Sequence, residues 1–192
     1  MHSETSRTST TATRVLEVAE RLAQTRGFNG FSYADIAAEL EITKASLHYH
    51  FASKAELGRA LILEYTRKFV AAIGAIAPAD APNALRRYVR LYEGVLVRDR
   101  MCLCGMLAAE YSTLPPEMQS ELKRFFEANE SWLEGVLQGG RAAGALRFEG
   151  SALEAARSLT AGLEGAMLLA RCYGEPKRFT SAAGLLLATL GA

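Results

Sequence analysis

Residues 32–51 read SYADIAAELEITKASLHYHF, and this stretch decides the fold of the N-terminal part of the chain. Ser32 is followed three residues later by Asp35, a capping-box spacing that predicts the start of a short helix. Apolar residues then recur at helical spacing on one face. Thr43 can cap a second helix after the turn at Glu41. The sequence therefore predicts two short helices joined by a tight turn.

The second of these helices carries lysine, serine, histidine and tyrosine but no acidic residue. Leu47 and Phe51 lie four residues apart, so we expect both to face the core. At about 100° per residue, Ala45 and Tyr49 point directly away from that face. An outward face with a cation, hydroxyls and imidazoles suits a helix that lies in the negative major groove of DNA.

Further helices are predicted on both sides of this pair. An amphipathic stripe over residues 15–23 ends at Arg26-Gly27, a typical helix stop. Residues 53–56, SKAE, repeat the capping-box spacing and begin a long helix. Its free amides and Lys54 together form a candidate phosphate site. We therefore expect an N-terminal head of three helices followed by the start of a fourth.

The run GFNGFSYADIAAELEITKASLHYHFASKAEL resembles the DNA-binding head of the TetR family of transcriptional regulators, over roughly residues 11–71. The order of helix, Gly-Phe, capped helix, turn and Ser-Lys-x-Glu-Leu carries the resemblance. Two positions depart from the family, which often has Gly at Glu41 and usually has Tyr at His48. The resemblance implies these DNA-facing residues: Tyr33, Thr43, Lys44, Ala45, Ser46, His48, Tyr49, His50 and Lys54.

Composition agrees with this interpretation without requiring it. The chain has 192 residues, a formal net charge of +1 and 49% hydrophobic residues. Such a chain can bury a real core, but its DNA affinity must come from a few locally placed positive groups. We expect a disordered arm over residues 1–10, a DNA-binding domain over 11–71, and a ligand-binding and dimerisation domain over 72–192.

The remainder of the chain also predicts helices, with Pro and Gly at the breaks. We expect these helices over about residues 53–76, 83–98, 102–114, 117–143, 151–173 and 179–190. The predicted fold class is all-α, with a three-helix helix-turn-helix head on a helical ligand-binding and dimerisation domain.

The last two predicted helices, 151–173 and 179–190, have almost no polar face. A helix that is apolar all round is buried on more than one side, and Ala and Gly permit close helix approach. A second copy of the chain would cover both helices in a four-helix seam about a two-fold axis. A monomeric core pair is the alternative. The TetR resemblance implies the same homodimer.

Aromatic and sulfur side chains of the middle helices are candidates for an apolar effector pocket. At helical spacing, ordinary core packing is the alternative interpretation. The candidate residues are Phe69, Tyr92, Met106, Tyr111, Phe126, Trp132 and Met167.

The three cysteines are an odd number, which argues against a secreted disulfide framework. Cys102 and Cys104 fit neither a CxxC redox pair nor a zinc ligand set, and buried apolar packing is the simplest interpretation. The alternative is a thiol that senses electrophiles or oxidants.

We therefore predict a cytoplasmic homodimeric transcriptional regulator, a repressor that binds a palindromic double-stranded DNA operator and is released by a small-molecule effector. The lack of a signal-peptide pattern and of a long uncharged apolar run underlies the predicted location and argues against a membrane partner. No catalytic constellation supports an enzyme, and we expect no cofactor and no metal. The alternatives are a thiol sensor acting through Cys102 or Cys104 and, more distantly, a helical carrier or enzyme without DNA binding.

Overall fold

The structure of the protein is a computed structural model that describes residues 2–192, with side chains from Thr11 onward. Within that range the secondary structure is helical and contains no strand, so the predicted all-α fold is confirmed. Residue 1 and the side chains of residues 2–10 lie outside the described part of the chain. The disordered arm expected over residues 1–10 therefore stays a prediction. Among the described residues, no helix is both long and apolar enough to cross a bilayer.

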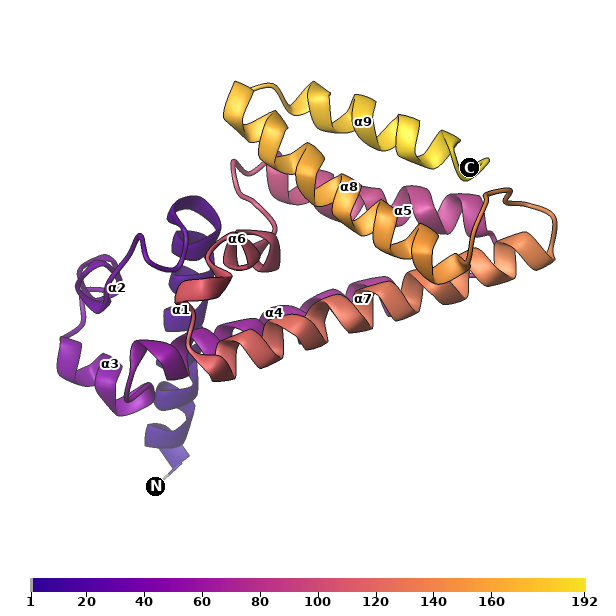
Figure 1. The fold of residues 1–192 in the computed structure, drawn as a ribbon. Coiled ribbons are helices and arrows are strands. Elements are labelled where there is room, and N and C mark those ends of the chain that lie inside the picture. The colour runs from indigo at the N-terminus through magenta and orange to yellow at the C-terminus, as the bar shows by residue number, and fades with distance from the viewer. Residues whose placement is uncertain (1) are drawn as a thin grey trace. The chain divides into compact units, whose positions relative to one another are not determined.

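The elements follow one another in the order shown in Figure 1. They are α1 (His2–Arg26), α2 (Tyr33–Leu40), α3 (Lys44–His50), α4 (Lys54–Gly74), α5 (Ala81–Leu96), α6 (Leu103–Ala109), the 3-10 turn η1 (Tyr111–Thr113), α7 (Pro116–Ala142), α8 (Ala152–Tyr173) and α9 (Pro176–Ala188).

Two predicted helix boundaries differ from the structure by more than two residues. The helix expected over residues 102–114 stops at Ala109 and continues as η1, where the Gln119 side chain donates to the carbonyls of Tyr111 and Leu114. That side chain satisfies backbone groups that a continuous helix would have used. The last helix begins at Pro176 because proline suits the first helical position, where no amide hydrogen is needed.

The chain forms two compact units. The first consists of Met1–Thr66 and Leu103–Lys123, and the second consists of Arg67–Cys102 and Arg124–Ala192. The segment from α6 to the start of α7 therefore packs with the N-terminal helices, a long-range pairing that no sequence pattern predicted.

In the first unit, the loop after α1 depends on Glu110, which lies between α6 and η1. The Glu110 carboxylate accepts hydrogen bonds from the backbone amides of Phe28 and Asn29, at 2.6 and 3.1 Å. Gly27 begins this loop with φ of 82°, and a Cβ there would lie 2.9 Å from Glu110 Oε1. Glycine is therefore needed for both the backbone angle and the close approach of the carboxylate.

In the second unit, α8 and α9 pack side by side, as Figure 1 shows. A Cβ added to Gly162 of α8 would lie only 2.8 Å from Leu186 Cδ1 of α9, so the glycine allows this close packing. The start of α8 is fixed by a capping box in which Ser151 and Glu154 bond reciprocally. Burial of Tyr88, Phe125 and other large side chains forms the core of this unit.

The turn between α2 and α3 places a non-glycine residue in the left-handed region. Glu41 has φ of 55° and ψ of 40°, and its amide bonds back to carbonyls of α2. A left-handed residue costs about 1–2 kcal/mol when it carries a Cβ, so glycine would suit this position better than glutamate.

We expect Glu41→Gly to stabilise the protein by up to about 1 kcal/mol, because relief of left-handed strain outweighs the roughly 0.5–1 kcal/mol of extra chain entropy. Urea unfolding should show a higher midpoint with an unchanged slope. The matched control, Ala38→Gly inside α2, should destabilise by about 1 kcal/mol. Equal losses in both variants would contradict the strain argument.

Candidate nucleic-acid interface and regulatory core

The two helices of the predicted motif begin as the sequence indicates. The Ser32 amide donates to Asp35 Oδ2 at 2.8 Å, which completes the capping box of α2. The Ser46 amide donates to Thr43 Oγ1 at 3.1 Å, so Thr43 caps α3. These short-range bonds fix where α3 starts and hence which of its side chains face outward.

Helix α3 has the inward and outward faces expected from its spacing. Leu47 is fully buried and Phe51 is nearly so, whereas Tyr49 is 79% exposed. Lys44 and Ala45 are also exposed. The remaining predicted DNA-facing residues of this stretch divide into the exposed Thr43 and His48 and the half-buried Ser46 and His50.

Tyr33 and His48 hold the end of α3 against α2. The Tyr33 hydroxyl donates to the Phe51 carbonyl at 2.9 Å, and its ring centroid lies 4.9 Å from that of His48. Burial, aided by the Glu56 charge, raises the pKa of Tyr33 to about 12, so the hydroxyl stays protonated and keeps donating. His48 Nδ1 lies 3.2 Å from the Ala52 carbonyl oxygen. Contact of either side chain with DNA stays a prediction.

Lys54, predicted to bind a phosphate, is engaged inside the first unit. Its ammonium donates to the carbonyls of Phe28 and Phe31 and lies 4.5 Å from the centroid of each ring. Burial lowers the pKa of Lys54, and the Glu110 charge opposes that effect. The residue therefore stabilises the loop between α1 and α2, and a DNA contact by its ammonium stays a prediction.

These features together define a class of protein. A capped second helix with a buried leucine, an exposed aromatic residue and an exposed lysine is the arrangement of a helix-turn-helix DNA-binding protein.

Comparison with known proteins identifies the family. Residues 15–61 match the family described as "Bacterial regulatory proteins, tetR family", and residues 79–186 match "Tetracyclin repressor-like, C-terminal domain". The chain belongs to the TetR family, whose members are ligand-responsive DNA-binding transcriptional regulators.

Solved structures agree along almost the whole chain. A TetR-family regulator from Agrobacterium tumefaciens is 33% identical, with a TM-score of 0.93 over 96% of this chain and 100% of that chain. A TetR regulator from Legionella pneumophila is 34% identical, with a TM-score of 0.84 over 92% and 95%. The HTH-type transcriptional repressor DhaR of Mycobacterium sp. (strain GP1) is 26% identical over 145 residues, 74% of this chain and 73% of that protein.

The predicted effector residues do not form one cluster. Met106 and Tyr111 belong to the first unit, and the other five belong to the second. Within the second unit, the Tyr88 ring lies 5.6 Å from Trp132 and 6.3 Å from Phe69, with Phe69 also 6.4 Å from Tyr92. Phe126 instead contacts Phe125, and Met167 is fully buried. The structure thus groups Phe69, Tyr92 and Trp132 around Tyr88.

The same unit contains a buried polar cluster that the sequence patterns did not predict. The Tyr88 hydroxyl donates to Asn129 Oδ1 at 2.8 Å and lies 3.0 Å from the Tyr92 hydroxyl. The Asn129 amide also donates to the Tyr92 hydroxyl at 3.3 Å. Two tyrosines four residues apart on α5 and an asparagine inside the apolar stripe of α7 were the available signals.

Glu164 of α8 lies beside this cluster. Neither carboxylate oxygen has solvent exposure or a hydrogen-bond partner, and Thr160 Oγ1 one turn earlier is in the same state. Burial raises the pKa of Glu164 to about 7, and the Cys102 thiol opposes this in part without reaching hydrogen-bond geometry. A buried carboxylate without a partner is a strong candidate for a functional group.

The cysteines show no feature of a reactive thiol. Cys102 and Cys104 are both buried, and only Cys172 is exposed among the three. A reactive sensor thiol needs exposure to solvent as well as a depressed pKa, and burial removes the first of these for Cys102 and Cys104. The thiol-sensor alternative therefore gains no support and stays a prediction.

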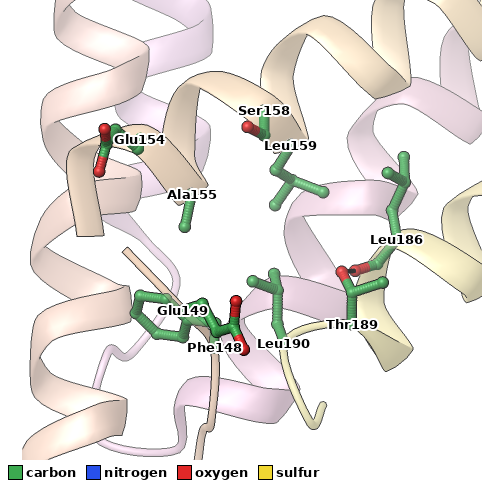
Figure 2. A pocket seen from close by; sticks show the side chains of 9 residues that line it. All are labelled: Phe148, Glu149, Glu154, Ala155, Ser158, Leu159, Leu186, Thr189 and Leu190. Atoms are coloured by element: carbon green, nitrogen blue, oxygen red, sulfur yellow. Dashed lines mark hydrogen bonds between the residues drawn. The ribbon is translucent and has the colours of Figure 1, made fainter. Parts of the chain in front are cut away.

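A surface cleft of about 330 Å³ opens beside the first turns of α8 and the end of α9, as Figure 2 shows. Its lining combines apolar residues such as Leu159 and Leu186 with the carboxylate of Glu154. Glu154 is already bonded to Ser151 in the capping box. None of the predicted effector residues lines this cleft.

We expect the buried Glu164 to make stability depend on pH. Between about pH 4.5 and pH 7 the folded protein keeps a proton that the unfolded chain loses. The free energy of unfolding should therefore fall by roughly 3 kcal/mol as pH rises through this window. In urea unfolding, Glu164→Gln should not show this fall in the free energy of unfolding with rising pH. The control Glu127→Gln, at an exposed residue of α7, should still show it. Parallel pH profiles for the wild type and Glu164→Gln would contradict the assignment.

Proposed function

We propose that two copies of this chain bind a palindromic operator through α3, repress transcription, and release the DNA when a small organic effector binds in the second unit. The observation that carries this proposal is the capped, acid-free α3 with Leu47 buried and Tyr49 exposed. The family membership supports DNA binding, and the relative named a transcriptional repressor supports repression rather than activation.

The outward face of α3 supplies the proposed DNA contacts. Lys44 and Tyr49 can reach base edges, and Ala45 between them permits close approach of the helix to the groove. Thr43, Ser46, His48 and His50 offer hydroxyl and imidazole groups for phosphates. The Lys54 ammonium, a further predicted phosphate contact, also donates to two carbonyls and so supports binding through the stability of the head.

Exposed apolar residues on α8 and α9 support the proposed dimer. Leu169 is 59% exposed and Leu185 is 72% exposed, and Leu168 and Tyr173 are also exposed. A Cβ added at Gly165 of α8 would meet no atom of the same chain within 4 Å. Exposed leucines on two packed helices are typical of a protein interface. We therefore propose the seam over residues 151–173 and 179–190.

Effector coupling needs an element shared by the two units. The helix α4 begins in the first unit and ends in the second. We therefore propose that a shift of its C-terminal half changes the position of the DNA-binding helices. An effector can drive this only if it binds the non-DNA-binding state more tightly.

For DNA binding, we expect Lys44→Ala and Tyr49→Ala to change sequence preference, with each good base contact worth about 1–3 kcal/mol. If Lys44 binds a phosphate instead of a base, Lys44→Ala should lower the salt slope by about one unit per half-site. Fluorescence anisotropy on duplexes selected from a random library, over a salt series, measures both. The control is Lys68→Ala, an exposed lysine of the second unit. Unchanged affinity and preference in both α3 variants would refute the recognition-helix assignment.

For the dimer, Gly165→Arg should place a bulky charge in the seam and yield a folded monomer, because the single chain leaves space at this position. Gly162→Arg is the matched control, since its side chain would strike Leu186 of the same chain and lower stability of the monomer itself. Light scattering and circular dichroism distinguish the two outcomes. A wild type that is monomeric at micromolar concentration rules out the dimer.

A further inference from the structure

We propose that Glu164 recognises the effector and that this effector is a small aryl-alkylammonium cation. Its charged nitrogen would meet the Glu164 carboxylate, and its ring would enter the aromatic cluster beside it. The inference rests on the proposed function, because it assigns the chemistry of the molecule to which the proposed repressor responds.

Three helices contribute polar side chains to the buried region around Glu164. Tyr88 and Tyr92 of α5 and Asn129 of α7 satisfy one another by hydrogen bonds of 2.8 to 3.3 Å. The Glu164 carboxylate of α8 takes no such partner, although its oxygens are removed from solvent. The Thr160 hydroxyl, one turn earlier on α8, lies close to Tyr88. The Glu164 carboxylate therefore lacks a hydrogen-bond donor or a positive charge on the α8 side of the cluster.

The surroundings of Glu164 favour a cation over a neutral donor. Tyr88 stacks on Trp132 at 5.6 Å, and Tyr92 stacks on Phe179 at 6.5 Å. Aromatic faces attract cations, and a buried carboxylate attracts them more strongly still. An anion would be repelled by the ionised form of Glu164, and a neutral molecule of the same shape would leave the charge of that form uncompensated. A cation favours ionisation of Glu164 and compensates the resulting charge.

A cleft of about 260 Å³ borders the aromatic cluster at Phe179. It is lined by Glu93, Leu96, Val97, Pro176, Phe179 and Thr180. Phe179 is shared by the cleft and the aromatic cluster, since its ring stacks on Tyr92. Glu93 adds a second carboxylate to the lining, which favours capture of a cation at the surface.

Entry from this cleft requires movement. Phe179, Tyr88 and Asn129 are fully buried, so a ligand reaches Glu164 only if these side chains and the helices that carry them shift. Binding at Glu164 therefore selects an altered arrangement of α5, α7 and α9, as a switch between two states demands.

The test uses the full-length protein and 2-phenylethylammonium as the probe, with neutral 2-phenylethanol as its matched analogue. In isothermal titration calorimetry, the ammonium should bind the wild type and Glu127→Gln alike. Its affinity should fall at least tenfold in Glu164→Gln, and the alcohol should bind the wild type at least tenfold more weakly. Glu164→Met, of similar length and without charge, repeats the test if the glutamine variant is poorly folded.

Proton release supplies a second readout. Because burial keeps Glu164 largely protonated at about pH 6, capture of a cation should release nearly one proton per site there and almost none at about pH 8.5. Titrations in buffers of different ionisation enthalpy measure this number. The groups that face Glu164 are Tyr88, Tyr92 and Cys102. Burial raises the pKa of both tyrosines, which therefore stay protonated at pH 6.

The proposal fails if benzylammonium, 2-phenylethylammonium and 3-phenylpropylammonium all leave the wild type unbound at millimolar concentration. It also fails if the alcohol binds equally well or if Glu164→Gln binds the ammonium unchanged. Binding of the same preparations to selected DNA without any probe tests the proposed function separately. A protein that binds DNA but no ammonium refutes this inference alone, whereas ammonium binding without DNA binding refutes the proposed repressor alone.

Discussion

The loop between α1 and α2 is held by two opposite charges, and the geometry of the DNA-binding head depends on them. The Glu110 carboxylate accepts the amides of Phe28 and Asn29, while the Lys54 ammonium donates to the carbonyls of Phe28 and Phe31. Each charge is partly removed from solvent and is satisfied by backbone groups, so these bonds are stronger than those between neutral groups. The loop in turn sets where α2 begins, and α2 supports α3.

This arrangement makes the N-terminal head depend on a remote segment. Glu110 lies in the part of the chain that follows α6, and Cys102, just before α6, lies beside Glu164 in the second unit. The chain segment from Cys102 to Glu110, together with α4 and α7, thus gives the proposed effector response a physical route. A change of packing around Glu164 that moved Cys102 would act on the same segment that holds the loop.

Much of the head could be predicted because its determinants are local. The capping box of α2, the Thr43 cap and the inward Leu47 need only residues three or four apart. The regulatory side chains could not be chosen in the same way. An aromatic residue at helical spacing can be core or pocket, and only its neighbours decide which; Met106 and Tyr111 prove to lie in the first unit. The role of Glu164 could not be predicted because burial of a single acidic residue in an apolar helix leaves no periodic signal in the sequence.

Local sequence patterns were enough to predict the helical class, the helix starts and the acid-free outward face of α3, because these follow from backbone capping and side-chain periodicity within one or two turns. Three other features needed the folded chain: Glu110 and Lys54 hold one loop, Asn129 bonds to Tyr88 and Tyr92, and Glu164 has no partner. They depend on residues far apart in the chain, and packing alone determines whether a buried charge finds a partner.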